Sequence, residues 1–345
     1  MLSLSSYCAQ TVYHLAVARE AISIEAIGSV RRLVARFADC TPMRRDRALS
    51  KVVEADVSLK LESLQPTGSF KIRGAAAKIA GLDHEARRRG VITASTGNHG
   101  RAVAHVARDL GIPATVCLSG NVPEGKIGLL AELGCALDIG GESQDAAFDR
   151  AIAASEEPGG PTLVHSILDP VVLCGQGTCG MEIAEQAPET TLVIVPVSGG
   201  GLIAGISVAI KALLPQARIV GVSMDRGAVM HASLEAGHPV QLPEVSDTLA
   251  DSLQGGIGLD NDTSFPIVEE LVEEIVLVTE EEIALGMRHA LREHRMVLEG
   301  AGAVGIAALL AGRISSRGGA IAVVCSGANA ELRTIAEMAA LEAVG

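Results

Sequence analysis

The chain has 345 residues, of which 48% are hydrophobic and 20% are charged, and its formal net charge is −13. These proportions are typical of a folded globular protein and exclude a disordered chain, and the negative charge argues against nucleic acid or an anionic membrane as partner. A chain of this length can form two lobes around a shared site, although one large domain would also fit.

The N-terminal residues 1–17 contain neither a basic region nor a long apolar core, so we expect no signal peptide and interpret them as a loosely attached arm. No stretch of about 18 apolar residues, the length needed to span a bilayer, occurs in the chain. The seven cysteines form no C-x-x-C pair, and some of them lie in apolar runs. We therefore expect buried, reduced thiols and a cytoplasmic protein.

From residue 57 onward, short apolar runs rich in β-branched residues alternate with segments of helical spacing, such as residues 98–111 and 123–134. This alternation predicts an α/β protein whose parallel sheets are flanked by helices. Nine strands are many for a single sheet. The predicted strands are residues 57–62, 90–95, 114–119, 136–141, 162–166, 192–197, 217–224, 274–280 and 320–327.

The segment PTGSFKIRGAAAKI places Lys71 at the start of a predicted helix, after a turn in which Thr67 or Ser69 is a plausible cap. Most lysines are solvated surface charges, but the flanks here are small and apolar. Such surroundings would desolvate the ammonium group. Desolvation lowers the pKa of a lysine and makes its amine a nucleophile for Schiff-base chemistry.

The segment VPVSGGGLIAGI predicts a strand that runs into Ser198, Gly199, Gly200 and Gly201 and then into a helix. Consecutive glycines let backbone N–H groups turn toward an anion, and the N-terminus of a helix adds positive potential. We therefore predict a phosphate or carboxylate site here. The alternative is that the glycines serve only close packing.

The segment ASTGNHG also joins a strand to a helix. Ser95, Thr96 and Asn98 offer hydroxyl and amide groups beside free backbone donors, which suits a substrate carboxylate. We expect His99 to have a packing or capping role. In the segment CSGANAE, Ser326 follows the last predicted strand, and ligands of open parallel sheets bind at the carboxyl ends of strands.

The segment EGAGAVG contains Gly300, Gly302 and Gly305 at the spacing of a dinucleotide-binding fold. That interpretation requires a preceding strand and an acidic residue at the end of the next strand. Only the short segment RMVLE precedes the glycines. The next predicted strand ends at Cys325 and Ser326, neither of which is the required acidic residue. A nicotinamide-dependent enzyme is therefore the weaker alternative.

Taken together, these segments resemble the threonine/serine dehydratase family of fold type II pyridoxal-phosphate (PLP) enzymes. The resemblance extends from Glu20 to the C-terminus and rests on LKLESLQPTGSFKIRGA, STGNHG, GQGT, VPVSGGGLIAGI, VTEEEI and CSGAN, in the family's order. It implies a two-lobed α/β fold like that of the tryptophan synthase β-subunit, with PLP between the lobes. The large lobe would comprise residues 1–85 and 168–345, and the small lobe residues 86–167. We also expect a homodimer that acts on a small molecule.

The resemblance implies that Lys71 forms the Schiff base with PLP and acts as the base at the substrate α-carbon. Ser326 would face the pyridine nitrogen, where a neutral hydroxyl leaves that nitrogen largely unprotonated and favours β-elimination over transamination. Ser95 and Thr96 would bind the substrate carboxylate. The implied cofactor contacts are Phe70, Lys71, Asn98, Ser198, Gly199, Gly200, Gly201, Leu202, Glu299 and Ser326.

The chain departs from the family pattern at several positions. Where relatives have an acidic metal-binding turn, this chain has Ser223, Gly227 and Val229, so we predict no metal. The segment ADSLQGGIG, residues 250–258, replaces the usual A-D-G, and Ile167 replaces an asparagine or aromatic residue that often lines the pocket.

The sequence therefore predicts a dehydratase of the ammonia-lyase type that removes water from a hydroxy amino acid. The segments STGNHGR, ADSLQGGIG and EGAGAVGIAALLAG are most similar to the hydroxyectoine-utilisation dehydratases. The alternatives are a serine racemase-like enzyme, a β-replacement enzyme and, outside this cofactor class, a nicotinamide enzyme or a catalytically dead relative. A dead relative should have lost Lys71. A racemase needs an acid/base hydroxyl at Thr96, whose β-branched side chain is stiff.

Overall fold

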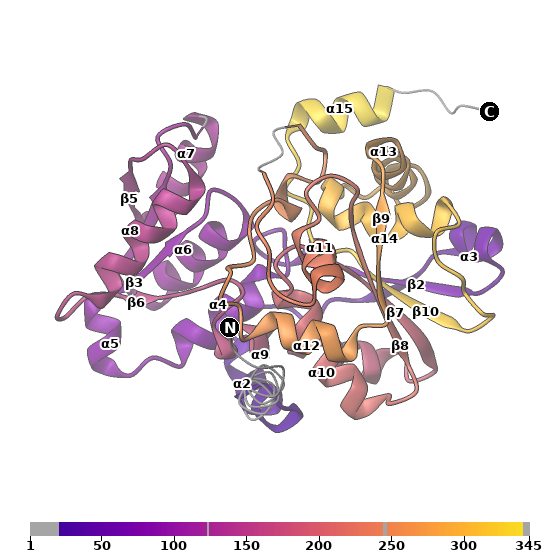
Figure 1. Ribbon diagram of the computed structural model, residues 1–345, viewed down its shortest axis with the longest axis horizontal. Helices are drawn as coiled ribbons and strands as arrows, with labels where there is room; N and C mark the ends of the chain where they lie inside the picture. The colour runs from indigo at the N-terminus through magenta and orange to yellow at the C-terminus, as the bar shows by residue number, and fades with distance from the viewer. Residues whose placement is uncertain (1–20, 123, 244–246, 341–345) are drawn as a thin grey trace.

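The computed structural model describes residues 21–122, 124–243 and 247–340, so the arm predicted at residues 1–17 lies outside the described chain. The described strands form two sheets, and Figure 1 shows the smaller one with its helices at the left and the larger one at the right. Each of the predicted strands is present, although the ends differ by a few residues.

The larger sheet has the strand order β1-β2-β10-β7-β8-β9. Its neighbours pair in parallel, except that β1 runs antiparallel to β2. The sequence prediction missed β1 because its residues, Met-Arg-Arg, show neither a β-branched run nor an alternating pattern. The strands are β1 (Met43–Arg45), β2 (Asp56–Lys60), β7 (Thr190–Pro196), β8 (Arg218–Met224), β9 (Glu274–Val278) and β10 (Ala320–Val324).

Helices cover both faces of the larger sheet, as the alternating side chains of β7 show. Val193 and Val195 pack into one hydrophobic cluster, and Leu192 packs into a second cluster on the opposite face. The first cluster involves α2 (Ile24–Val34), α9 (Pro170–Gln186), α10 (Gly201–Leu213), α11 (Val229–Ala236) and α12 (Ser264–Leu271). The second involves α3 (Arg47–Val53), α13 (Glu280–His289), the π-helix η3 (Ala290–His294), α14 (Gly300–Leu310) and α15 (Leu332–Ala340).

The smaller sheet has the order β5-β4-β3-β6 and is parallel. Its strands are β3 (Val91–Ala94), β4 (Ala114–Leu118), β5 (Ala136–Ile139) and β6 (Thr162–Leu163). The associated helices are α4 (Lys71–Ala80), α5 (His84–Arg89), α6 (Asn98–Leu110), α7 (Glu124–Ala131) and α8 (Gln144–Glu156). Two 3₁₀ turns, η1 (Glu62–Leu64) and η2 (Asp251–Leu253), lie outside residues 86–167. These strands fall within residues 86–167, but the lobe limits stay a prediction.

Three of the motifs follow the carboxyl ends of parallel strands. Ser95 follows β3, Ser198 follows β7 and Ser326 follows β10. Helix α4, which begins with Lys71, packs against both α9 and α6 and so lies where the two lobes meet. Among the described helices, none combines the length and the hydrophobicity that a membrane span requires.

Candidate active site

Lys71 is the first residue of α4, and the backbone before it is held beside the end of β10. The Phe70 amide donates to the Ser326 carbonyl oxygen at 3.0 Å. Ser69 and Gly327 form an antiparallel bridge next to this contact. The fold therefore brings Lys71 and Ser326, which are far apart in the sequence, to one place.

Neither Thr67 nor Ser69 caps α4, so the sequence prediction of a side-chain cap was wrong. Phe70 occupies the N-cap position with φ −55° and ψ −21°, and no side chain caps the helix. A capping side chain normally requires an extended backbone at this position, whereas Phe70 is already helical. The hydroxyl oxygens of Thr67 and Ser69 are buried without a hydrogen-bond partner among the described residues. Buried polar atoms of this kind are expected to bind a ligand or water.

The surroundings of the Lys71 ammonium group disfavour its charge. Lys71 is half-buried, and its Nζ atom lies 5.1 Å from the centroid of the Phe70 ring. Desolvation lowers the pKa of Lys71 to about 8, and the negative charge of Glu299 opposes this effect only in part. A lysine with such a pKa is partly a neutral amine, and thus a nucleophile, near neutral pH.

Glu299 immediately precedes α14 and is hydrogen-bonded to residues of both lobes. Its carboxylate accepts hydrogen bonds from Asn98 Nδ2 at 2.8 Å, from Ser252 Oγ at 3.0 Å and from the Asn329 amide at 3.1 Å. Burial raises the pKa of Glu299 to about 7, although these hydrogen bonds act in the opposite direction. A carboxyl group and a lysine with pKa values close to each other therefore lie in the same site.

Asn98 is the first residue of α6 and reaches across to the larger lobe. Its Oδ1 accepts a hydrogen bond from Asn329 Nδ2 at 2.6 Å, and the same nitrogen lies 3.0 Å from the Thr67 carbonyl oxygen. The sequence prediction named Asn98 and Glu299 but missed their partners Asn329 and Ser252. Asn329 lies in the CSGAN segment, which could have revealed it, whereas Ser252 lies in a loop without a recognisable motif.

The glycine loop 198–202 connects β7 to α10, and its three glycines are too closely packed to carry side chains. Gly200 has a φ of +87°, a left-handed conformation that favours glycine. A Cβ atom on Gly201 would lie 2.8 Å from the Ser166 carbonyl oxygen. Because α10 begins at Gly201, the amides of its first turn have no partners within the helix and are free to bind an anion.

Two segments that depart from the family pattern lie beside the glycine loop. Ser198 Oγ is 3.5 Å from the Gln254 carbonyl oxygen, which places the 250–258 segment against this loop. Ile167 packs into the same hydrophobic cluster as Leu202, the last residue of the loop. Phe70 also packs against this cluster.

Ser95 and Thr96 lie in the turn between β3 and α6, and both are half-buried. Ser95 Oγ accepts a hydrogen bond from the Gly97 amide at 3.3 Å. His99 is buried with its Nε2 atom 2.9 Å from the Val164 carbonyl oxygen, and burial lowers the pKa of His99 to about 3. The imidazole is therefore neutral and donates this hydrogen bond, which agrees with a packing role.

The glycines of EGAGAVG serve helix packing. They lie in α14, which is buried along nearly its whole length, and a Cβ atom on Gly302 would lie 2.4 Å from the Gly327 carbonyl oxygen. The described residues between η3 and α14 form no strand. Both observations argue against the nicotinamide alternative.

Comparison with known proteins identifies the family. Residues 34–327 match the family of pyridoxal-phosphate-dependent enzymes. The chain belongs to this family. Its cofactor is pyridoxal phosphate, which confirms the sequence prediction.

Similar proteins narrow the type of enzyme. The chain is 48% identical over 314 residues, 90% of its length and 93% of the relative's, to a Sinorhizobium fredii protein whose name assigns it provisionally to the threonine dehydratases. It is 41% identical over 314 residues to the L-threonine ammonia-lyase of Thermotoga maritima, covering 91% of this chain and 77% of that one. The chain is thus a PLP-dependent lyase similar to the threonine ammonia-lyases.

Solved structures confirm the predicted two-lobed fold. Maize serine racemase superimposes with a TM-score of 0.86 at 33% identity, covering 92% of this chain and 96% of that one. The processed threonine deaminase isoform 2 of Solanum lycopersicum gives a TM-score of 0.85 at 32% identity, covering 95% and 89% of the two chains. A threonine deaminase and a serine racemase therefore share this architecture, so the reaction must be argued from the site.

The segment for which the sequence predicts no metal lies around the turn between β8 and α11. Ser223 is buried in β8, and Val229 is the first residue of α11. With neither a carboxylate nor a free amide oxygen at Ser223, Gly227 and Val229, we predict that adding Mg²⁺ or Ca²⁺ to chelator-treated enzyme leaves its activity unchanged. Steady-state assays before and after addition test this, and a loss of activity that Mg²⁺ restores would contradict it.

The raised pKa of Glu299 predicts how the stability of the PLP-free protein depends on pH. The folded state favours the protonated carboxyl group of Glu299. This group therefore contributes to the free energy of unfolding below pH 4.5, and the contribution is lost as the pH rises through about 7. The loss corresponds to roughly 3 kcal/mol. The Glu299→Gln variant should lack this decline, which urea unfolding of both proteins at pH 5 and pH 8 measures. Equal pH dependence in the two proteins would show that Glu299 titrates normally.

Proposed function

We propose that this lyase removes water from a hydroxy amino acid by β-elimination and that Lys71 is the residue to which PLP attaches. The observation that carries this proposal is the position of a desolvated lysine beside the end of β10. Its pKa of about 8 leaves roughly a tenth of the amine neutral at pH 7, far more than in an ordinary lysine.

The residues around Lys71 fit PLP. The glycine loop offers backbone amides for the phosphate, because the first-turn amides of α10 have no partners within the helix. The Phe70 ring lies beside the lysine amine, and the unpartnered hydroxyl groups of Thr67 and Ser69 lie in the same segment. When bound, the cofactor would supply the electron sink that makes the substrate α-proton acidic.

In this proposal the chain's own groups direct the reaction. The Lys71 amine would accept the α-proton, and the Asn98 amide, which Glu299 and Asn329 hold in place, would bond the cofactor's phenolic oxygen. Ser326 would face the ring nitrogen with a neutral hydroxyl group, where a carboxylate would hold a proton on that nitrogen. This arrangement favours elimination over transamination.

Ser95 and Thr96 would bind the substrate carboxylate, because their turn presents hydroxyl groups and backbone amides at the start of α6. A racemase would additionally need the Thr96 hydroxyl to deliver a proton from the face opposite Lys71. The β-branched threonine has a restricted χ1 and does not readily reorient. Elimination therefore stays the proposed reaction, and a β-replacement activity is supported by no feature of this site.

The substrate proposed here is a ring-opened derivative of hydroxyectoine. Gly255 and Gly256 are exposed, and a Cβ atom on either would meet nothing within 4 Å, so the segment beside the glycine loop leaves room for a side chain longer than that of threonine. Intact hydroxyectoine has its nitrogens in a cyclic amidine and lacks the free amine that Lys71 chemistry requires. The ring-opened form supplies that amine.

Steady-state kinetics on one enzyme preparation test the substrate proposal. We expect kcat/KM for the ring-opened hydroxyectoine derivative to exceed that for L-threonine by about tenfold, which corresponds to about 1.4 kcal/mol in transition-state binding. A tenfold preference for L-threonine would make the enzyme a plain threonine dehydratase. Formation of D-serine from L-serine faster than pyruvate would instead favour the racemase alternative.

Two further expectations belong to the same proposal. The described cysteines are free thiols, which suits a reducing compartment such as the cytoplasm. The homodimer expected from the resemblance is checked by light scattering of the purified protein. A monomer that retains full activity would refute it.

A further inference from the structure

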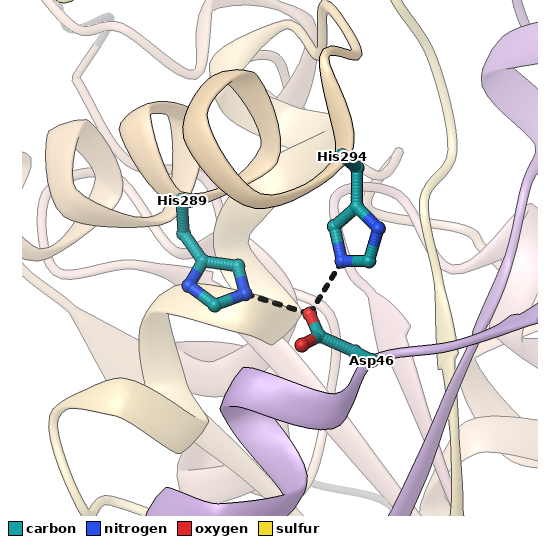
Figure 2. Close-up of side chains that lie close together, drawn as sticks. All are labelled: Asp46, His289 and His294. Atoms are coloured by element: carbon teal, nitrogen blue, oxygen red, sulfur yellow. Dashed lines mark hydrogen bonds and ion pairs between the residues drawn. The ribbon is translucent and has the colours of Figure 1, made fainter.

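A buried cluster of two histidines and one aspartate lies outside the site described above. Asp46 Oδ2 is 2.6 Å from His289 Nε2 and 2.9 Å from His294 Nε2. Figure 2 shows both imidazole rings pointing toward this one carboxylate oxygen. The side chain of Asp46 is fully buried, and those of His289 and His294 are 10% and 5% exposed.

The carboxylate is held in place before any ligand binds. Asp46 Oδ1 accepts a hydrogen bond from the Leu49 amide at 2.9 Å and so caps α3, while the Asp46 amide donates to the Val57 carbonyl oxygen at 2.9 Å. Oδ2 is thus left to face the two imidazoles. A fixed carboxylate of this kind is what a preorganised metal site requires.

An unusual backbone brings the two histidines together. They are five residues apart, and in a regular α-helix such residues point roughly 140° away from each other. Here α13 continues into the π-helix η3, which ends at His294, and Arg295 follows with a φ of +57°. The wider π turn turns both Nε2 atoms toward Asp46. Single π turns occur frequently at functional sites.

The charge of Asp46 is held by hydrogen bonds from a backbone amide and from two imidazoles, and not by a permanently charged side chain. Within the described residues no lysine or arginine pairs with this carboxylate, and its ion-pair partners are the two histidines. With neutral imidazoles the cluster carries one buried negative charge, which a bound cation would neutralise. A divalent cation would do so.

We propose that Asp46, His289 and His294 bind a divalent transition-metal ion of the Zn²⁺ class. The prediction of no metal rested on a different segment, the turn between β8 and α11, and did not consider this cluster. The three ligand atoms lie within 4.8 Å of one another. Two imidazole nitrogens and one carboxylate oxygen suit Zn²⁺, Co²⁺ or Ni²⁺, whereas Mg²⁺ and Ca²⁺ prefer oxygen ligands. Bond lengths of about 2.0 Å place tetrahedral ligands roughly 3.3 Å apart, so the oxygen has to move from the nitrogens by about half an ångström.

Protons rearrange when the ion binds. Each Nε2 must present a lone pair to the metal, so the proton of a neutral ring moves to Nδ1. His294 Nδ1 is buried without a hydrogen-bond partner among the described residues and is therefore free to carry this proton. Because the cluster is closed and joins α13 and η3 to α3, the ion would be structural.

Metal binding to the holoenzyme tests this proposal. The absorption of bound Co²⁺ reports occupancy of the site, and the melting temperature with and without Zn²⁺ reports stabilisation. Asp46→Asn is the sharpest variant, because asparagine also caps helices well but removes the ligand charge. His294→Gln removes a second ligand. His231→Gln is the matched control, since His231 lies outside the cluster and pairs with Glu235 instead.

The wild type and the His231→Gln control should each bind one Co²⁺ per chain with visible ligand-field absorption, measured as a difference spectrum. In Asp46→Asn and His294→Gln the affinity should fall by about tenfold or more. Zn²⁺ should raise the melting temperature of the wild type and of His231→Gln, and it should leave that of Asp46→Asn and His294→Gln unchanged. Should either ligand variant fail to fold, the more exposed His289→Gln carries the same test. Equal Co²⁺ binding in all variants, or none in the wild type, would overturn the proposal.

Discussion

Replacing Lys71 with alanine should lower kcat for elimination by about 10²–10⁴-fold or more, because the variant lacks the base at the α-carbon as well as the attachment point of PLP. Lys71→Arg should be similarly inactive. Arginine keeps the positive charge but cannot supply a neutral amine near neutral pH. Steady-state assays of ammonia and 2-oxo acid formation measure the effect.

The matched control for this experiment is Lys51→Ala, since Lys51 is an exposed lysine on α3. Its activity should equal that of the wild type. Absorbance of bound PLP in each protein separates loss of the cofactor from loss of the base. If Lys71→Ala retained more than about a tenth of the wild-type kcat, another group would have to be the base.

The second large expected effect is a loss of PLP affinity when a glycine of the loop 198–202 is replaced. Gly200→Ala should weaken PLP binding by about 5–30-fold, because a non-glycine residue at a φ of +87° is strained by roughly 1–2 kcal/mol. The new Cβ atom would also lie 2.7 Å from the Met230 methyl group. Titration of PLP-free protein with PLP, followed by absorbance, gives the affinity.

Gly28→Ala is the control for the glycine loop. Gly28 lies in α2, and a Cβ atom there would meet nothing within 4 Å, so PLP affinity should be unchanged. Gly201→Ala should be at least as damaging as Gly200→Ala, because its Cβ atom would approach the Ser166 carbonyl oxygen. If both loop variants bound PLP as tightly as the wild type, the loop would not hold the phosphate.

The sequence predicted those parts of the fold that local patterns determine. The runs of β-branched residues in β7 and β8 mark buried parallel strands, and the motifs after β3, β7 and β10 lie at strand ends as expected. Strand β1 was missed because its pairing depends on β2 and not on its own residues. The predicted cap of α4 was wrong because Phe70 already has a helical backbone.

The environment of the site was less accessible from sequence. Motifs identify Lys71 and Glu299, but the pKa values of both depend on burial and on partners from distant loops, such as Ser252. The pair His289 and His294 escaped notice because its five-residue spacing matches no regular helical face and becomes productive only through a π turn. Tertiary structure decides such features.

Reduction of the PLP-loaded enzyme with borohydride, followed by peptide mapping, tests the central claim most directly. Borohydride fixes the cofactor to the lysine that carries it, so a pyridoxyl group should appear on the peptide that contains Lys71 and on no other lysine. The label should be absent when Lys71→Ala is treated in the same way. A wild-type protein that takes up no PLP, or one whose label lies on another lysine, would contradict the account.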